Sequence, residues 1–338
     1  MKKKLVILLM ILMMICVAIV SYAEAAPVKI KLIAASHVPP SYHDILPLEQ
    51  AFIDDVNKIG VGRVELDFYH SGTLLGVNEL VPGLEIGTAD IIFHTTSHTT
   101  GSWPVIGGAS LPFLYKNAYD LRERFKVGSP LYELVAKTML DKHEVLILAY
   151  GAMPMEYIWT NKPVRTPGDM KGLTIRVGGD AEAKAVKSLG GSPVFMPSGE
   201  LYEALQRGTV DGVVCYAGTI GGRSLQEVVK YCTKVPIGAY GRGIFIKKST
   251  WDSLPEDVRT LLYVEAIKYD YNHLESAEAV HKNEYWSKKF TEAGMEIIEP
   301  PEEVVAEFRE KCKPVWSEWA NEIGDELGNK FIDLATSK

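Results

Sequence analysis

Short runs of alternating hydrophobic and polar residues recur along the first part of the chain, separated by segments with helical spacing. The strand-like segments alternate apolar and polar side chains, whereas the helical ones repeat apolar side chains every three to four residues. Strands that alternate with helices predict a parallel sheet and an α/β fold. The expected strands are 28–33, 64–69 and 89–93, and the expected helices are 45–59 and 79–86.

The same alternation returns over residues 145–246. Ser198 suits the N-cap of a helix that Gly208 would close. The expected strands are 145–150, 173–177, 193–196, 212–215 and 243–246, and the expected helices are 181–189 and 198–206. A chain of 338 residues also has the length of about two domains of ~150 residues each.

The last third of the chain has a different pattern. Pro255 suits the first position of a helix, and neither glycine nor proline interrupts the chain from there to Gly294. A helix of that length exceeds what a compact domain needs, so it would lie across more than one domain. After it we expect a strand at 295–298 and more helix from Pro301, broken at Pro314.

Residues 1–25 have the layout of a secretory signal peptide. Lysines follow Met1, an unbroken apolar run extends over Leu5–Val20, and Ala23-Glu24-Ala25 gives a cleavage site. The apolar run is shorter than the ~20 residues of a spanning helix, which argues against a membrane anchor. We therefore expect export to the periplasm and cleavage near Ala25.

Composition and net charge argue against some classes of binding partner. The chain is 47% hydrophobic and 23% charged, as globular proteins are, and its net charge is −7. Loss of the lysine-rich signal peptide makes the mature chain more acidic still. No basic block stands out, so we expect no nucleic-acid partner, because phosphate binding needs clustered positive charge.

Cysteine usage excludes a disulfide-rich scaffold. Cys16 lies in the signal peptide, where the bulky Ile15 argues against lipid attachment. Cys215, Cys232 and Cys312 remain after cleavage, and they can form one disulfide at most. Their spacing does not decide whether any pair is bridged.

The chain carries none of the catalytic or cofactor-binding motifs that we sought. It has no nucleophile elbow, no G-x-G-x-x-G loop, no phosphate loop and no H-E-x-x-H. His94 and His98 are four residues apart, but no carboxylate or thiolate is placed with them as a metal site needs. We expect a binding protein without metal or cofactor rather than an enzyme.

In α/β folds, ligands contact the loops at the carboxyl ends of strands. Arg176 is the most informative candidate, because Ile175 and Val177 would face one side of the strand and Arg176 the other. A buried arginine needs a partner, either an internal carboxylate or a ligand carboxylate, and residue chemistry leaves both open. The other side chains at such loops are His37, His94, Thr95, His98, Trp103, Glu156, Tyr157, Cys215 and Tyr216.

Two motifs then point to a family. The sequence D-M-K-G-L-T-I-R-V covers residues 169–177, and E-L-Y-E-A-L-Q-R-G-T-V-D-G covers residues 200–212. Together they resemble the DctP-type solute-binding proteins of tripartite ATP-independent periplasmic (TRAP) transporters. Weaker matches extend the resemblance over essentially the whole mature chain, at Leu75-Gly76, 87–90, 111–114 and 251–255.

The resemblance implies a two-lobed fold like that of type II periplasmic binding proteins, with a central cleft, hinge strands and a long helix spanning both lobes. Residues 26–153 with about 242–281 would form lobe I, and about 154–241 with 282–338 would form lobe II. The resemblance also implies a protein, monomeric by default, that captures a small organic acid. It would deliver this acid to the membrane subunits of a TRAP permease, and its lobes would close around the acid.

By the resemblance, Arg176 is the arginine that clamps the ligand carboxylate. Glu156 stands where the family often has a second arginine, Cys215 where it often has asparagine, and Ser198 where it often has phenylalanine. These departures favour a monocarboxylate with hydroxyl, aromatic or amino groups over a simple dicarboxylate. Glu156 would bind ligand hydroxyls or an ammonium group, or else pair with Arg176 or lie at the surface. The expected walls, some of them also ordinary core residues, are His37, His94, Thr95, Trp103 and Tyr216.

Other functions stay open at this point. A binding protein that feeds a chemoreceptor or sensor would have the same two-lobed shape. An exported enzyme acting on an organic acid would use His37, His94 or Cys215 as acid, base or nucleophile.

Overall fold

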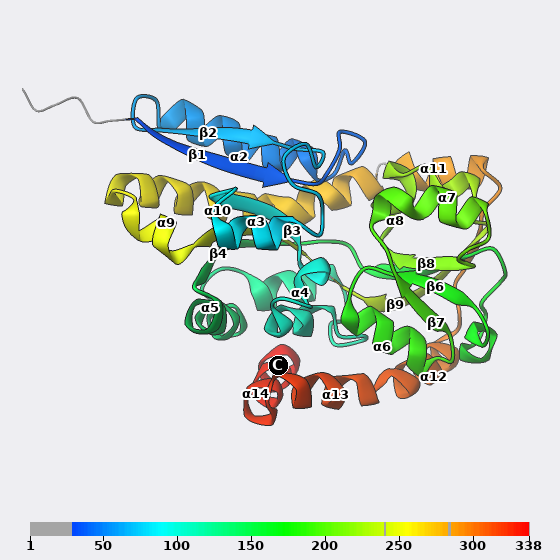
Figure 1. Cartoon of the computed structure of the whole chain (residues 1–338). Helices are drawn as coiled ribbons and strands as arrows, with labels where there is room; N and C mark the ends of the chain where they lie inside the picture. The colour runs from blue at the N-terminus through cyan, green and yellow to red at the C-terminus, as the bar shows by residue number, and fades with distance from the viewer. Residues whose placement is uncertain (1–28, 240, 283–284, 338) are drawn as a thin grey trace, which may run out of the picture.

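The computed structural model describes residues 29–239, 241–282 and 285–337, which fold into two lobes side by side (Figure 1). The expected signal peptide lies outside these residues. Within them, no helix combines the length and the apolar character that crossing a membrane requires.

The first lobe is built on the sheet β2-β1-β3-β10-β4, in which β1 is parallel to β2 and β3 while β10 is antiparallel to both of its neighbours. Helix α2 buries Phe52, Ile53 and Val56 against the sheet and ends at Gly60, as its amphipathic pattern predicts. The elements are β1 (Ile30–Ser36), α2 (Leu46–Ile59), β2 (Val64–Tyr69), α3 (Leu80–Ile86), β3 (Ile91–Thr95), η1 (Thr96–Thr99), η2 (Pro104–Ser110), α4 (Ala118–Phe125), α5 (Pro130–His143), β4 (Val145–Ala152), β10 (Gly241–Lys247) and α9 (Lys248–Ser253).

The second lobe is built on the sheet β11-β9-β5-β8-β6-β7. Strands β6, β7 and β8 are parallel, and β5 is antiparallel to β8 and β9. The elements are β5 (Glu156–Thr160), η3 (Pro167–Met170), β6 (Thr174–Val177), α6 (Asp180–Ser188), β7 (Ser192–Phe195), η4 (Ser198–Glu200), α7 (Leu201–Gln206), β8 (Gly212–Cys215), α8 (Ala217–Gly222), η5 (Leu225–Glu227), β9 (Tyr231–Gly238), β11 (Glu296–Ile298) and α12 (Glu302–Cys312).

Two segments cross between the sheets next to each other. One leads from β4 through residues 153–155 into β5, and the other leads from β9 into β10. The crossing segments pair with each other in both lobes, since Gly241 lies opposite Ala152 and Glu156 lies opposite Gly238. These paired strands are the structural counterpart of the expected hinge.

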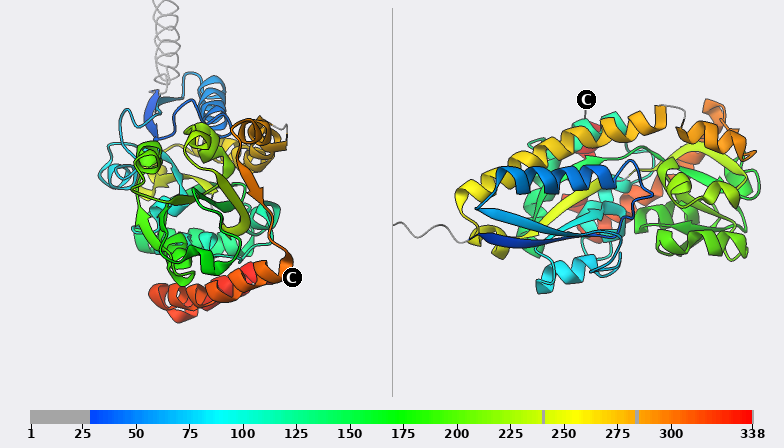
Figure 2. Two further views of the ribbon diagram at one scale, coloured as in Figure 1. Left: turned by 90° about the vertical axis from the view of Figure 1, so that its right-hand side faces the viewer. Right: turned by 90° about the horizontal axis from the view of Figure 1, so that it is seen from above.

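The expected long helix is present as α10 (Glu256–Lys282), which packs on α2 and β4 of the first lobe. Its C-terminal end points towards the second lobe (Figure 2). There α11 (Tyr285–Glu292) packs on α8, and the rings of Phe290 and Trp159 lie 5.4 Å apart. The uninterrupted helix predicted up to Gly294 is therefore described as two helices, α10 and α11.

The C-terminal helices return to the first lobe, which differs from the expected placement of residues 282–338 in lobe II. Helix α12 contacts η3 and α6 of the second lobe, α13 (Pro314–Ile323) contacts both α6 and η2, and α14 (Asp325–Thr336) packs on η2 and α5 (Figure 1). Trp319 and Phe331 belong to the first lobe's core. The glycine at 108 makes this packing feasible, because a Cβ there would lie 2.5 Å from the Phe331 ring.

Candidate ligand-binding site

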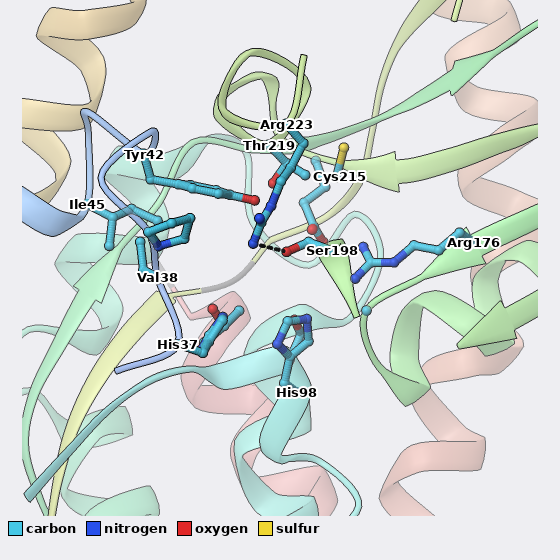
Figure 3. A pocket seen from close by; sticks show the side chains of 15 residues that line it. His37, Val38, Tyr42, Ile45, His98, Arg176, Ser198, Cys215, Thr219 and Arg223 are labelled. Carbon is cyan, nitrogen blue, oxygen red and sulfur yellow. Dashed lines mark hydrogen bonds between the residues drawn. The ribbon is translucent and has the colours of Figure 1, made fainter. Parts of the chain in front are cut away.

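A cavity lies between the lobes, bordered by segments from both (Figure 3). The first lobe contributes the segment after β1 and the end of β3 with η1. The second lobe contributes the ends of β5, β6 and β8, together with η4 and α8. The lining residues are His37, Val38, Pro39, Tyr42, Ile45, Thr95, Ser97, His98, Glu156, Arg176, Gly178, Ser198, Cys215, Thr219 and Arg223.

Arg176 reaches the cavity from β6 in the way that strand alternation predicts. Ile175 and Val177 pack into the core of the second lobe, while Arg176 lines the cavity and is only 3% exposed. Its Nε donates a hydrogen bond to the carbonyl oxygen of Met196 at 2.8 Å. Its Nη2 is buried without a hydrogen-bond partner among the described residues. A buried guanidinium with a free N–H is suited to an anionic group inside the cavity.

Glu156 lines the cavity at the start of β5 and is almost completely buried. Burial raises the pKa of its carboxyl well above the ordinary value, and the neighbouring Glu182 raises it further, while the Arg176 charge opposes the shift. Glu182 is a residue that the sequence analysis did not select. It lies in the first turn of α6, and its Oε2 accepts a hydrogen bond from the Gly178 amide at 2.6 Å.

Three imidazole rings cluster at the first-lobe side of the cavity. The ring of His37 lies 5.4 Å from that of His94 and 5.7 Å from that of His98. His37 and His98 line the cavity, whereas His94 does not. Burial lowers the pKa of all three, that of His94 to about 3, and the charge of Arg242 lowers them further. All three rings are therefore neutral near pH 7, and those of His37 and His98 can exchange hydrogen bonds with a polar ligand.

A second arginine, Arg223, lines the cavity from the end of α8. Its Nη2 donates to the Ser198 hydroxyl at 3.2 Å, and its guanidinium carbon lies 5.3 Å from the centre of the Tyr42 ring. The sequence analysis found no second cation, because nothing in the local pattern around Gly222 distinguishes Arg223 from a surface residue. Ser198 does not act as the expected N-cap, since α7 starts at Leu201 and is capped at Glu200.

The other expected residues separate into two groups. Thr95 and Cys215 line the cavity, and the Thr95 hydroxyl accepts a hydrogen bond from the buried Arg242 at 2.8 Å. Trp103 and Tyr216 do not line it. Trp103 packs on Phe245 with ring centres 4.9 Å apart, and Tyr216 lies in a core cluster, where its hydroxyl donates to Asp44. Trp103 and Tyr216 are therefore core residues, which was the alternative to a role in ligand binding.

Cys215, Cys232 and Cys312 are free and buried, which leaves no disulfide among the cysteines of the described residues. Burial raises the pKa of the Cys215 thiol, so it is a poor nucleophile near neutral pH. Across residues 29–337, apart from the undescribed positions, no group of three or more histidine, cysteine, aspartate or glutamate side chains is placed to hold a metal ion.

The lobes touch each other directly around the cavity. Gly179 of the second lobe is so close to the first that a Cβ at this position would lie 2.5 Å from the carbonyl oxygen of Ser97. The His98 ring of the first lobe lies 6.3 Å from the Phe195 ring of the second. The two lobes are therefore in direct contact next to the cavity.

Comparison with known proteins identifies the class. The profile of DctP, described as bacterial extracellular solute-binding protein, family 7, matches residues 35–322. The chain therefore belongs to this family of solute-binding proteins. The C4-dicarboxylate-binding periplasmic protein DctP of Rhodobacter capsulatus is 27% identical over 282 residues, which are 81% of this chain and 82% of that protein.

Solved structures show the same fold. A TRAP periplasmic solute-binding protein from Chromohalobacter salexigens with bound D-glucuronate has a TM-score of 0.83 and 22% identity, covering 91% of this chain and 100% of that one. DctP7 of Bordetella pertussis, an extracytoplasmic solute receptor binding pyroglutamic acid, has a TM-score of 0.82 and 20% identity, covering 90% and 99%. The family and the two-lobed α/β fold predicted from the sequence are thus confirmed.

Proposed function

We propose that this protein is the extracytoplasmic solute-binding subunit of a TRAP transporter, and that it captures a small organic acid through Arg176. Membership of the family supports the receptor role. The observation that carries the proposal is the buried Nη2 of Arg176, which faces the cavity without a partner among the residues described. A planar guanidinium matches a carboxylate in charge and shape.

The cavity chemistry bears on the class of acid. Relatives of known structure bind D-glucuronate and pyroglutamic acid, which carry one carboxylate and further polar groups. In this chain, the neutral His37 and His98 and the carboxyl of Glu156 line the same cavity as Arg176. They can accept hydrogen bonds from ligand O–H or N–H groups. A monocarboxylate with such groups fits these walls better than a plain dicarboxylate does.

The mechanism follows from the position of the ligand between the lobes. An acid that docks on Arg176 in the second lobe gains contacts with His37 and His98 of the first lobe only when the lobes close. Ligand binding therefore shifts the equilibrium towards the closed form by the free energy of these added contacts. We propose that the membrane subunits of the permease recognise this closed surface, and that export to the periplasm brings the protein to them.

The test is a thermal-shift screen of the mature protein, residues 26–338, against D-glucuronate, pyroglutamate, succinate, L-lactate and amino acids. A ligand of the folded state stabilises it by RT ln(1 + [L]/Kd), so the melting temperature rises with the logarithm of its concentration over Kd. We expect Arg176→Ala to weaken a true acid ligand by about 100-fold, because a buried charge-assisted pair is lost.

Arg165→Ala is the matched control, since Arg165 lies in the same lobe but is exposed and pairs with Glu296. Arg176→Lys keeps the charge without the planar fork, and it should restore only part of the affinity. An acid whose shift persists unchanged in Arg176→Ala would contradict the proposed clamp.

A further inference from the structure

A pair of buried carboxyl groups lies beside Arg176. Glu156 lines the cavity, whereas Glu182 does not, and the two side chains are 3% and 0% exposed. The amide of Gly178 fixes one oxygen of Glu182 with a hydrogen bond of 2.6 Å. Nothing in the family motifs of residues 169–177 and 200–212 includes either glutamate.

The carboxyl groups of Glu156 and Glu182 interact with each other. If both were ionised, neither would have a proton to donate, and the two negative charges would repel each other. Their mutual interaction contributes to the raised pKa of Glu156, in addition to burial. Glu156 Oε2 and Glu182 Oε1 are buried, and neither oxygen has a hydrogen-bond donor in the described part of the chain. Two buried carboxylates that share one site cannot both stay ionised without a strong penalty, whereas one proton between them removes it.

We propose that Glu156 and Glu182 share one proton near neutral pH, and that this pair selects acids with one carboxylate and a neighbouring O–H or N–H group. The proposal rests on the proposed function, because it concerns the acid that Arg176 binds. The charged residues lining the cavity are Arg176, Arg223 and Glu156, so with one proton on the pair they leave one net positive charge. That charge matches a single ligand carboxylate.

The titratable groups around Glu156 and Glu182 keep one protonation state near pH 7, so the pair is the site that can gain or lose a proton. Arg176 of β6, Tyr150 of β4 and Cys215 of β8 interact electrostatically with Glu156, and a Cβ at Gly238 of β9 would lie 2.7 Å from its Oε2. Burial raises the pKa of both Tyr150 and Cys215, so both stay neutral. His98 of η1 faces Arg176, and burial keeps it neutral too.

Two consequences follow for binding. A second ligand carboxylate next to Glu156 would meet a negative charge and be repelled, whereas an O–H or N–H group would donate to the glutamate. When the pH rises far enough to remove the shared proton, a second negative charge appears beside the ligand carboxylate. The affinity for a monoanionic acid should then fall with rising pH.

The first experiment looks for the proton itself by infrared spectroscopy of the mature protein in H2O and D2O at pH 7. A protonated carboxyl group gives a C=O band that shifts in D2O, and carboxylates do not. We expect the band to lose intensity equal to one carboxyl group in Glu156→Gln and also in Glu182→Gln, because each variant leaves one ionised glutamate. Asp270→Asn identifies the contribution of another buried carboxyl, and the exposed Glu203→Gln is the control.

If one variant fails to fold, an unchanged band in the other is enough to overturn the shared proton, and a loss equal to one carboxyl group supports it. A band that is unchanged in both variants, or no band beyond that of Asp270, would overturn the shared proton. Loss in one variant only would place the proton on a single carboxyl and overturn the shared pair.

The second experiment measures selectivity with the acids of the thermal-shift panel. In the wild type, succinate should bind at least about tenfold more weakly than the monoanionic acids that bind, because like charges repel in a buried site. The double variant Glu156→Gln/Glu182→Gln should reduce this difference and flatten the decline of affinity between pH 7 and 9. Equal pH profiles in both proteins would overturn the proposal, whereas an absence of any Arg176-dependent ligand would instead refute the proposed function.

Discussion

The two arginine side chains at the cavity come from positions next to apolar residues or glycine in the chain. Arg176 lies between Ile175 and Val177, both buried, and Arg223 follows the last glycine of α8. A guanidinium stays charged in any surroundings, so it needs a partner wherever the fold desolvates it. For Arg176 and Arg223 the cavity is the place where such a partner would bind.

Arg223 should contribute to the affinity for an acid ligand. We expect Arg223→Gln to weaken binding of an acid ligand by about tenfold, the worth of one charged hydrogen bond. Calorimetric titration with the acid found in the screen measures the change. Arg207→Gln is the control, because Arg207 pairs with Glu203 on the exposed side of α7. Equal loss in both variants would contradict a role for Arg223 in the cavity.

The buried histidines should make the protein sensitive to acid. His37, His94 and His98 are neutral in the folded state, with pKa values below the ordinary 6.5. The unfolded chain takes up protons below pH 6.5 that the folded chain cannot, so the free energy of unfolding falls as the pH drops from there. Each imidazole contributes about 1.4 kcal/mol per pH unit until its lowered pKa is reached.

Urea unfolding between pH 7 and 4.5 tests this. His94→Gln should reduce the slope by about one proton, whereas His43→Gln, at an exposed position, should leave it unchanged. A slope that His94→Gln does not alter would show that His94 is protonated in the folded state.

At the scale of elements, closure depends on how closely α6 approaches η1. The N-terminal end of α6 starts at Gly179, directly against the Ser97 carbonyl of the other lobe. A Cβ on residue 179 would collide with the Ser97 carbonyl oxygen. The paired crossings β4–β5 and β9–β10 connect the two lobes.

Gly179→Ala should therefore oppose closure while each lobe stays folded. Its Cβ would lie 2.5 Å from Ser97 O, closer than atoms can approach, so the lobes must separate. We expect a smaller compaction on ligand addition in small-angle scattering and an affinity about tenfold lower, since closure supplies part of the binding energy. Gly101→Ala is the control, because a Cβ there meets nothing within 4 Å. Full compaction in Gly179→Ala would contradict this account.

At the scale of the whole molecule, the C-terminal helices join the lobes. Helix α12 contacts the second lobe, and α13 and α14 complete the core of the first. Trp319 is central to this contact: its Nε1 donates to the carbonyl oxygen of Pro104 at 3.0 Å, and its ring lies 4.9 Å from that of Phe331.

Trp319→Ala should lower the free energy of unfolding by about 3–5 kcal/mol, the usual cost of removing a buried tryptophan. Urea denaturation measures this change, with the neighbouring exposed Glu318→Ala as the control. A loss below about 1 kcal/mol, the typical effect of a surface change, would show that the α13–α14 arm packs only loosely on the first lobe.

The sequence alone determined most strands of both sheets, although not β5 and β9, as well as the family and the orientation of Arg176. These follow from alternation over four to eight residues and from two continuous motifs, and both are properties of neighbouring residues. Local pattern also marked His37, Thr95, Glu156 and Cys215 as residues at strand ends, where the structure brings them to the cavity.

Only the tertiary structure decided which distant side chains meet. Glu182 reaches Glu156 through the packing of α6 on β6 and β9, Arg223 reaches Ser198 through the placement of α8, and α13 returns to the first lobe. The side chains of Trp103 and Tyr216 are also buried in the cores of the molecule because of long-range packing. Periodicity tells which face of an element is buried, but the partner of that face is set by long-range packing, in which segments far apart in the chain compete for the same apolar surface.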